Sequence, residues 1–422
     1  MTAAKQAPAS AGRPEVIIVG GGPAGLAAAA RLAPRVTGTV LVLEREEHAG
    51  GIPRHSDHSG YGLRDLHRLM RGPQYARRLD GLARDAGAVV CTSAMVTGWD
   101  PGGGVAVTSP DGRQVLTAPV ILLATGARER PRSARLVPGD RPAGVYTTGQ
   151  LQNLVHLHHQ VPGSRAVVAG SELVSWSAVL ALRHAGCATV LMASVHDRPE
   201  SYAAVTLAGR TALGFPVAAR TKVTRVIGRG RVEAVEIMHL GTGRRRVVPC
   251  DTVVFTGDWI PDNELARAAG LGIDAGSGGP VVDTALRTSA DGIFAAGNLV
   301  HPVDTADVAA LSGRHAARQI ERWLAGDRPD RRGVRLAAAP PLRWVSPGLV
   351  RPGDPAPARQ RLLAWADELV RAPRVTLIQD GHRIASMRLP WAAAPGRIFR
   401  MPSSLLDHID PGGGEATVSL RG

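Results

Sequence analysis

The chain has 422 residues, a hydrophobic content of 44% and a formal net charge of +14 at pH 7. This length is enough for two or three domain cores. Nearly all of the positive charge comes from arginine, since Lys5 and Lys222 are the only lysines. The charges are scattered and only 4% of the residues are aromatic, so no basic segment carries interleaved stacking rings, and we do not expect nucleic-acid binding.

Membrane insertion and export are not expected either. No run of about 18 apolar residues occurs, and residues 1–13 lack the apolar core of a signal peptide. We interpret residues 1–13 as a disordered tail and expect a cytoplasmic protein with no transmembrane segment, with peripheral membrane association left open.

The three cysteines give no redox or metal motif. Cys91, Cys187 and Cys250 lie far apart, and no CxxC pair is present. Each lies beside an apolar run, so we expect three buried structural thiols. Three cysteines cannot by themselves hold an iron–sulfur cluster or a structural zinc.

Residues 16–32 read VIIVGGGPAGLAAAARL, which predicts a buried strand, a glycine turn and an apolar helix. Gly20 permits the tight turn, Gly22 lets the backbone approach a pyrophosphate, and Gly25 lets the helix pack closely on the strand. Pro23 and Ala24 then begin the helix, whose N-terminal amides and dipole bind a diphosphate. The pattern predicts a dinucleotide-binding domain.

The next predicted strand, residues 40–43, ends at Glu44. A carboxylate at this position can accept hydrogen bonds from a ribose and repels a 2′-phosphate. Glu44 therefore completes the predicted dinucleotide site.

Three later segments favour FAD over NAD. They are GG at 50–51, the strand-like run ILLATG at 121–126 and the run GIFAAGN at 292–298. Together they resemble the FAD half of the two-dinucleotide-domain flavoproteins, the group that includes thioredoxin reductase. The resemblance adds these cofactor-binding candidates: Gly51, Thr125, Gly126, Gly297 and Asn298.

The same resemblance implies roles for the segment around residue 300. The group usually has Asp where this chain has Asn298, and Asn can still hydrogen-bond a hydroxyl of the ribityl chain. A helix beginning near Thr305 and Ala306 is expected to face the flavin pyrimidine and stabilise the reduced anion.

Residues 166–182, AVVAGSELVSWSAVLAL, repeat the strand-turn-helix pattern in altered form. Gly170 corresponds to Gly20, but Glu172 replaces Gly22 and Ser175 replaces Gly25. A carboxylate at this turn adds bulk, and its repulsion of a pyrophosphate amounts to roughly 1–4 kcal/mol. The following strand ends at 192–194 (MAS) with no acid for a ribose. The alternative that Glu172 points away and a nucleotide binds by another route stays open.

The predicted fold class is α/β, with an FAD-binding Rossmann-like domain at 14–148 and 257–326 and an inserted second Rossmann-like domain at 149–256, the thioredoxin-reductase-like topology. Residues 327–342 are interpreted as a linker and 343–422 as a small α+β C-terminal module. In that module we expect a hairpin at 375–389, a short helix at 403–408 and a strand at 416–420. Its role is interpreted as subunit docking, or as simple completion of the fold.

Four segments narrow the resemblance: GGIPRH at 50–55, ARERPR at 127–132, DWIP at 258–261 and GN at 297–298. They resemble the FAD-binding A-type subunits of hydrogen cyanide synthase, opine oxidase and related amino-acid dehydrogenase complexes. The resemblance implies one subunit of an FAD-dependent oxidoreductase that acts on a small amine, amino acid or opine-like substrate. It also implies partner subunits: an amine-oxidase-like flavoprotein and a small [2Fe–2S] protein. Some A-type subunits carry cluster-binding cysteines near the C-terminus, and this chain has none there.

Residues 51–67 are expected to pass close to the flavin. Arg54, His55 and His58 are the catalytic candidates, with the histidines as acid or base and Arg54 as a binder of a carboxylate or a flavin carbonyl. The alternative is a polar loop without a catalytic role. No metal site is expected, because the histidines at 156, 158 and 159 fit an exposed helix end.

Two other functions stay open at this point. One is a self-sufficient NAD(P)H-dependent flavin reductase. The other is a non-catalytic scaffold in which a bound nucleotide stabilises an assembly.

Overall fold

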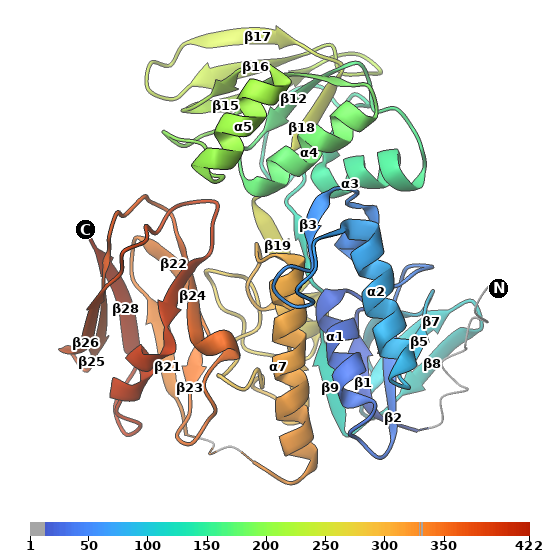
Figure 1. The fold of residues 1–422 in the computed structure, drawn as a ribbon, viewed down its shortest axis with the longest axis vertical. Helices are drawn as coiled ribbons and strands as arrows, with labels where there is room; N and C mark the ends of the chain where they lie inside the picture. The colour runs from blue at the N-terminus through green and yellow to red at the C-terminus, as the bar shows by residue number, and fades with distance from the viewer. Residues whose placement is uncertain (1–12, 329, 331) are drawn as a thin grey trace. The chain divides into compact units, whose positions relative to one another are not determined.

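The computed structural model describes residues 13–328, 330 and 332–422 (Figure 1). The chain forms two compact units. Unit 1 holds the described residues up to 54, together with 60–127 and 261–422, and unit 2 holds 55–59 and 128–260. Apart from Arg13, the predicted tail lies outside the described residues.

Unit 1 is built on a parallel five-stranded sheet with the order β20-β9-β1-β2-β5. Its central strands are continuous apolar runs because they are buried on both faces; Val16, Ile17 and Ile18 have no exposed surface. The bounds are β1 Pro14–Val19, β2 Thr39–Leu43, β5 Val89–Cys91, β9 Val120–Leu123 and β20 Ile293–Ala295.

Helices α1 (Pro23–Leu32) and α7 (Ala306–Leu324) pack against each other beside this sheet (Figure 1). Small residues bring their backbones together: a Cβ added at Gly313 would lie 1.9 Å from the Ala24 carbonyl oxygen. Helix α2 (Gly72–Asp85) packs on α1, and the short α6 spans Glu264–Ala268. The glycine and alanine content of these helices therefore fixes their separation.

Two smaller strand groups complete the first part of unit 1. One is an antiparallel sheet with the order β6-β7-β8, and the other pairs β3 with β4. Their bounds are β3 Ser59–Tyr61, β4 Met70–Arg71, β6 Met95–Trp99, β7 Val105–Ser109 and β8 Gly112–Leu116.

The C-terminal part of unit 1 has its own apolar core between two sheets, β23-β21-β28-β25-β26 and β22-β24-β27. The expected hairpin, short helix and last strand are confirmed, the helix being of the 3₁₀ type at Ser403–His408. The strands are β21 Val334–Ala338, β22 Leu342–Ser346, β23 Leu349–Val350, β24 Arg361–Ala366, β25 Arg374–Gln379, β26 His382–Arg388, β27 Phe399–Pro402 and β28 Ala416–Arg421.

Part of the predicted linker is a strand. β21 lies within residues 327–342 and pairs in parallel with β28, with Leu336 opposite Ala416. Val334 and Leu336 are buried while Arg335 is exposed, the alternation of a half-buried strand. The proline and arginine content around this strand concealed its period-two pattern.

Unit 2 repeats the parallel arrangement with the order β11-β18-β12-β13-β14, and β15-β16-β17 form an antiparallel sheet. The bounds are β11 Val145–Thr147, β12 Arg165–Ala169, β13 Ala188–Ala193, β14 Val217–Ala218, β15 Thr221–Ile227, β16 Ala234–His239, β17 Arg245–Pro249 and β18 Thr252–Phe255. The helices are α3 Thr148–Gln152, continued by a π-helical turn at Asn153–Leu157, α4 Leu173–His184 and α5 Ala203–Leu213.

Unit 2 begins earlier than the predicted boundary at residue 149. β11 pairs with β18 in the main sheet of unit 2. β10 (Ala127–Glu129), where the chain enters unit 2, pairs with β19 (Trp259–Pro261), where the chain leaves it. The Glu129 carboxylate accepts hydrogen bonds from the backbone N–H of Gly149 and Gly257, 3.0 Å each. These bonds tie residues 128–148 to unit 2.

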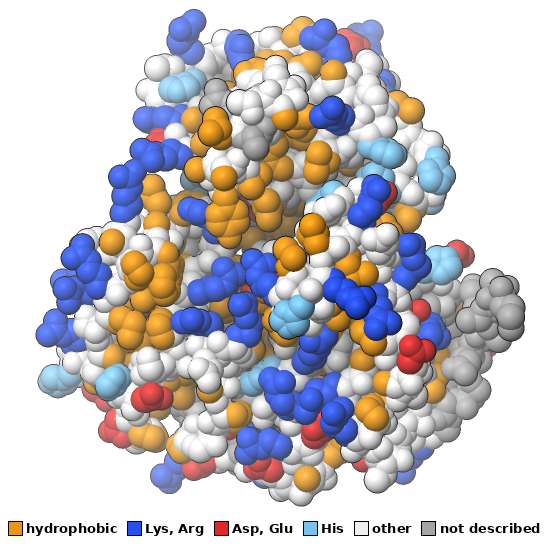
Figure 2. All heavy atoms as spheres, viewed as in Figure 1, with side chains coloured by type: hydrophobic (Ala, Val, Ile, Leu, Met, Phe, Trp, Pro, Cys, Tyr) orange, Lys and Arg blue, Asp and Glu red, His pale blue; other side chains and the backbone are white. Residues whose placement is uncertain are grey.

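Within the described ranges, no helix is long and apolar enough to cross a membrane. Figure 2 shows the basic side chains in several separate groups on the face in view, with hydrophobic side chains between them. This distribution agrees with the scattered arginines of the sequence.

The close contact of α1 with α7 gives a stability prediction. Gly313→Ala places a Cβ against backbone atoms of Ala24, which cannot rotate away, so we expect a loss of about 1–3 kcal/mol in the free energy of unfolding. Gly81→Ala, in α2 with nothing within 4 Å of its Cβ, is the control and should gain about 0.5–1 kcal/mol. Urea unfolding measures both, and equal stability of the two variants would contradict the packing described for α1 and α7.

Candidate functional site

The turn after β1 has two glycines that the chain's own packing requires. Gly20 has φ +107°, and a Cβ there would lie 2.4 Å from the Ala124 carbonyl oxygen. A Cβ at Gly25 would lie 2.0 Å from the carbonyl oxygen of Gly20. Both positions confirm the close approach of strand, turn and helix that the sequence pattern predicted.

Gly22 differs, because the fold itself does not need a glycine there. Its φ of −81° suits any residue, and the nearest atom to an added Cβ is the Gly51 Cα at 4.0 Å. Gly22 is the N-cap of α1, Pro23 follows it, and no side chain caps this helix end. The turn therefore leaves open space in front of a helix N-terminus, which fits a pyrophosphate.

The Glu44 carboxylate is held against the same turn. Its Oε2 accepts a hydrogen bond from the Gly21 N–H at 2.8 Å, and its Oε1 accepts one from the Glu46 N–H at 2.8 Å. Burial raises the pKa of Glu44, while these backbone donors lower it. The anchored carboxylate keeps further lone pairs for ribose hydroxyls, as the prediction requires.

Asn298 offers an unused acceptor. Its Nδ2 donates to the Asp304 carbonyl at 3.0 Å, while its buried Oδ1 has no hydrogen-bond partner in the described chain. A Cβ at the preceding Gly297 would lie 2.8 Å from the Ala24 Cβ, so this segment passes directly beside α1. An orphaned buried oxygen at this place fits a ligand hydroxyl such as that of a ribityl chain.

Helix α7 begins as predicted, with Thr305 as its N-cap and Ala306 as its first residue. Sequence reasoning missed the role of Asp307, whose buried carboxylate accepts hydrogen bonds from the Thr305 hydroxyl and the Val308 N–H. Arg64 forms an ion pair with Asp307 at 3.3 Å. The positive end of α7 thus carries a paired carboxylate of the protein.

Gly51, Thr125 and Gly126 lie around the same turn. Gly51 has φ +59°, and a Cβ there would lie 3.0 Å from the Gly22 Cα. The Thr125 hydroxyl donates to the Asp262 carbonyl at 2.7 Å, and the Asp262 N–H donates to the Gly126 carbonyl at 3.0 Å. Thr125 and Gly126 therefore hold the chain at Asp262, where it comes back to unit 1 from unit 2. Their contact with a cofactor stays a prediction.

The structure does not assemble the three catalytic candidates into one described site. Arg54 belongs to unit 1, where it donates to the His48 carbonyl at 2.9 Å and pairs with Glu46 at 3.6 Å. His55, which is buried, and His58 belong to unit 2. Their catalytic role stays a prediction.

His58 forms part of a polar network in unit 2. Its Nε2 lies 3.1 Å from the Ser56 hydroxyl, which also accepts a hydrogen bond from Gln152 Nε2 at 3.2 Å. Gln152 Nε2 donates to the Ser177 hydroxyl at 2.7 Å. These contacts give His58 a structural function in addition to the predicted one.

The second turn, after β12, is filled by the side chain of Glu172. Glu172 is the N-cap of α4, and its Oε2 accepts a hydrogen bond from Trp259 Nε1 at 3.2 Å. A Cβ added at Gly257 would meet its Oε1 at 2.2 Å. The side chain therefore spans from α4 to the turn after β18, across the carboxyl ends of two neighbouring strands, where Rossmann-like domains bind nucleotides.

The equivalent space in unit 1 is open. β9 lies beside β1 as β18 lies beside β12, and each is followed by a glycine in a turn. A Cβ at Gly126 would have nothing within 4 Å, in contrast to Gly257. The two units thus share the parallel strand arrangement, and the side chain of Glu172 fills in unit 2 the space that is open in unit 1.

A second carboxylate at this turn was missed by sequence reasoning. Glu200 Oε2 accepts hydrogen bonds from the Ser171 N–H at 3.3 Å and the Ser171 hydroxyl at 3.0 Å. Glu44 bonds the corresponding N–H of Gly21 in unit 1. The end of β13 itself carries no acid, as the sequence indicated, but a carboxylate from the loop after β13 reaches this turn.

The protonation of the two acids differs. Burial, with the nearby charge of Glu200, raises the pKa of Glu172 to about 8. Burial alone would also raise the pKa of Glu200, but His196 and Ser171 lower it below its usual value. Burial therefore favours the protonated form of Glu172, which weakens the predicted repulsion of a pyrophosphate and leaves the steric obstruction by the side chain.

The cysteines are free and buried, as expected. Burial raises the pKa of each thiol to about 11, so they are not thiolates at neutral pH. In the described part of the chain, no group of three or more His, Cys, Asp or Glu side chains could hold a metal ion.

This fold and its open glycine turn define a flavoprotein with two dinucleotide-type units. The chain belongs to the pyridine nucleotide-disulphide oxidoreductase family, whose model matches residues 14–313. Members of this family are FAD-dependent oxidoreductases, and FAD is accordingly the cofactor of this chain.

Several curated relatives agree with this assignment. The chain is 28% identical over 294 residues to thioredoxin reductase of Treponema pallidum (68% of this chain, 88% of that one). It is 30% identical over 269 residues to the biphenyl dioxygenase system ferredoxin–NAD(+) reductase component of Paraburkholderia xenovorans (62% and 57%). It is 27% identical over 334 residues to an opine oxidase subunit of Rhizobium meliloti (72% and 61%).

Solved structures show the same fold. The thioredoxin reductase of T. acidophilum matches with a TM-score of 0.62 and 21% identity, covering 74% of this chain and 98% of that one. The thioredoxin reductase of Lactococcus lactis matches with a TM-score of 0.62 and 20% identity, covering 75% and 100%. The thioredoxin-reductase-like topology predicted from the sequence is confirmed.

The open space at Gly22 gives a binding prediction. Gly22→Ala meets no protein atom closely, so the variant should fold normally, yet its methyl group enters the space for a pyrophosphate and should weaken FAD retention about tenfold or more. Gly22→Glu, which copies the second turn, should abolish retention. The flavin absorbance of the purified protein measures both.

Gly98→Ala on β6, where an added Cβ also has nothing within 4 Å, is the matched control and should keep FAD. A Gly22→Glu protein that purifies with one FAD per chain would contradict the assignment of this turn.

The raised pKa of Glu172 gives a pH prediction. The folded chain keeps a proton that the unfolded chain loses between pH 4.5 and about 8, so the stability contribution of Glu172 falls as the pH rises through that window. Glu172→Gln removes this titration. The free energy of unfolding of the Glu172→Gln variant, relative to that of the wild type, should therefore rise from pH 5 to pH 8 and then level off. Because one pKa unit corresponds to about 1.4 kcal/mol, the total rise should be a few kcal/mol.

Thermal unfolding at pH 5, 7 and 9 measures the difference. Glu233→Gln, at an exposed position of the same unit, is the control and should show no such trend. A pH-independent difference for Glu172→Gln would show that Glu172 is ionised throughout.

Proposed function

We propose that the chain is the FAD-carrying subunit of a heteromeric dehydrogenase or oxidase that acts on a small amine, an amino acid or an opine-like compound. One observation carries this proposal: the first dinucleotide turn is open, whereas Glu172 fills the second. A chain that binds FAD without NAD(P)H must obtain or deliver electrons through another substrate or another protein.

FAD supplies a two-electron acceptor. In the proposal, the backbone N–H groups on either side of Pro23 at the start of α1 bind its diphosphate, the Glu44 carboxylate accepts hydrogen bonds from its ribose, and Asn298 Oδ1 accepts one from its ribityl chain. The predicted acid–base residues are His55 and His58, and Arg54 is the predicted binder of a carboxylate.

The route of the electrons is part of the same proposal. Thioredoxin reductases of this family use a cysteine pair, but the three thiols here are separate, buried and protonated at neutral pH. A protein partner is therefore the natural acceptor. The similarity to ferredoxin reductase components and to an opine oxidase subunit supports an amine-oxidase-like flavoprotein and a small [2Fe–2S] protein as partners.

A self-sufficient NAD(P)H-dependent reductase is the second candidate. Glu200 favours it, because this carboxylate sits against the Ser171 amide as Glu44 does against Gly21. In this alternative, Glu200 binds the ribose of NADH, and Glu172 turns away to admit the pyrophosphate.

Anaerobic titration of the FAD-loaded chain separates the two candidates. We expect NADH and NADPH to bleach the flavin more slowly than about 1 s⁻¹, below the usual range of turnover numbers, because Glu172 blocks the pyrophosphate. Glu172→Gly should speed bleaching by NADH if Glu200 is otherwise a competent ribose acceptor. Dithionite should bleach both proteins, which controls for a redox-active flavin.

Bleaching of the wild type by NADH at a turnover rate would contradict the proposed heteromeric role and support the reductase. With slow bleaching established, L-amino acids and opines are tested as donors with and without the co-expressed partner subunits. The proposal expects flavin reduction only when the partners are present.

A further inference from the structure

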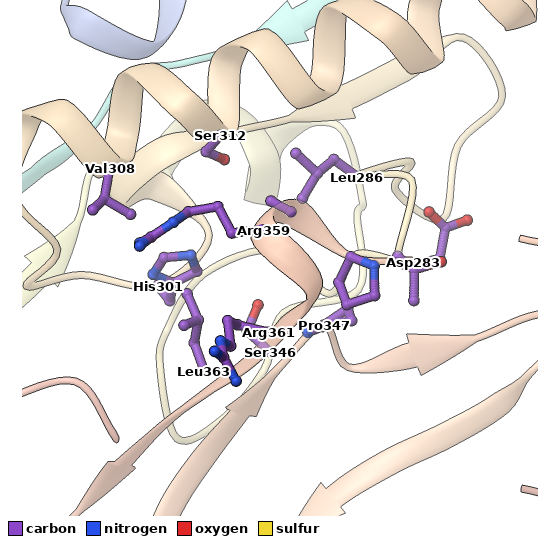
Figure 3. A pocket seen from close by; sticks show the side chains of 13 residues that line it. Asp283, Leu286, His301, Val308, Ser312, Ser346, Pro347, Arg359, Arg361 and Leu363 are labelled. Carbon is purple, nitrogen blue, oxygen red and sulfur yellow. The ribbon is translucent and has the colours of Figure 1, made fainter. Parts of the chain in front are cut away.

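Unit 1 contains a pocket between the first turns of α7 and the C-terminal sheets (Figure 3). Its volume is about 40 Å³, and its walls come from three segments of the chain, 283–286, 301–312 and 346–363. One water requires about 10–15 Å³ on this measure. The space therefore suits a group of a few atoms and is too small for a ring system.

His301 brings an unused polar atom to this pocket. Its side chain is 6% exposed, and its Nδ1 has no hydrogen-bond partner in the described chain. The ring stacks on Trp344 with centroids 5.9 Å apart, which fixes its plane. Burial lowers the pKa of His301, so the ring is neutral near pH 7 and can carry its single N–H on Nδ1.

Two arginines add positive charge to the same walls. Arg359 and Arg361 line the pocket, and neither guanidinium has an ion-pair partner among the described residues. In Figure 3 the nitrogen end of Arg359 lies beside His301 and that of Arg361 lies beside Leu363, while the Asp283 carboxylate points away. Asp283 is already paired with Arg287 at 2.7 Å and Arg351 at 3.1 Å.

The acids near Arg359 do not balance these charges. Asp304 pairs with Arg400 at 3.2 Å, and Asp307 pairs with Arg64. The positive charges here are those of four arginines, and the negative charges are those of Asp304 and Asp307, which leaves two positive charges in excess. The four arginines are Arg64, Arg359, Arg361 and Arg400. Arg359 and Arg361 are solvent-exposed residues at the wall of the pocket, and an unbalanced positive charge of this kind attracts an anion.

The backbone at Arg359 has an unusual conformation that sets the direction of its side chain. Arg359 and Gln360 have φ values of +59° and +53°, in the left-handed region that glycine or asparagine adopts more readily. A non-glycine residue in this region costs about 1–3 kcal/mol and persists where the surrounding structure holds it there. Here the turn directs Arg359 into the pocket.

We propose that this pocket binds a small oxyanion, a carboxylate or a phosphate group, through the guanidinium groups of Arg359 and Arg361 and the N–H of His301. Such an anion would lie beside residues 297–306, the segment predicted to contact the flavin. The proposal does not depend on the function proposed for the flavin itself.

The test uses the full chain loaded with FAD. Equilibrium dialysis with radiolabelled inorganic phosphate and, separately, acetate measures binding at constant pH and at an ionic strength fixed with chloride. We expect one saturable site per chain for at least one of the two anions. Binding of phosphate alone identifies a phosphorylated ligand as the source, and binding of acetate alone identifies an organic acid.

Variants locate the site. Arg359→Asn keeps a residue that tolerates the left-handed turn, and Arg361→Gln keeps the side-chain length; each should weaken binding about tenfold or more. Arg335→Gln is the matched control. Arg335 lies on β21 in the same C-terminal part of unit 1, does not line the pocket, and pairs with Glu415 at the surface. It should bind as the wild type does.

Two results would overturn the proposal. The first is the absence of saturable binding of either anion to the wild-type protein, a result that does not depend on how the variants fold. The second is saturable binding that persists unchanged in a folded Arg359→Asn, Arg361→Gln double variant.

Discussion

Backbone-to-backbone packing around α1 is the constraint on which unit 1 depends. Gly25 lets the helix meet the Gly20 carbonyl, and Gly313 lets α7 meet the Ala24 carbonyl. Both contacts exclude any side chain, so the start of α1, the turn before it and the part of α7 around Gly313 are held at fixed distances. Gly22, which the packing does not require, is left facing open space. Among the glycines of this turn, Gly22 is the one that the packing does not require, and it is the one predicted to face the pyrophosphate.

Unit 2 uses the same parallel strand order with a different turn. Glu172 reaches from α4 to Gly257 and fills the turn with its side chain, with Trp259 as its hydrogen-bond donor. Burial raises the pKa of Glu172 and so favours its protonated, space-filling form. Glu200 supplies the charge at the same turn. In unit 2, the space that a dinucleotide-binding turn leaves for its ligand is thus occupied by the side chain of Glu172.

Sequence reasoning predicted the elements of this structure where local pattern determines them. The glycine turn at 20–25, the strand before Glu44 and the hairpin at 375–389 follow from periodicity and turn chemistry. It missed features that depend on residues distant in the chain. Glu200 reaches the second turn from a loop, Asp307 is fixed by Arg64, and β21 is a strand because β28 lies beside it. No local window contains these pairs. The sequence also does not show the burial that raises the pKa of Glu172.

The central claim is that this chain has one dinucleotide site and not two. Its most direct test is the number of nucleotides bound per chain at saturation. The oxidised protein is equilibrated with excess FAD and excess NAD⁺ or NADP⁺, separated rapidly from free ligand, denatured, and its nucleotides are counted by chromatography. One FAD per chain with no bound pyridine nucleotide is the result that the structure predicts. One FAD together with one NAD⁺ or NADP⁺ per chain would contradict it and would show that Glu172 leaves the second turn.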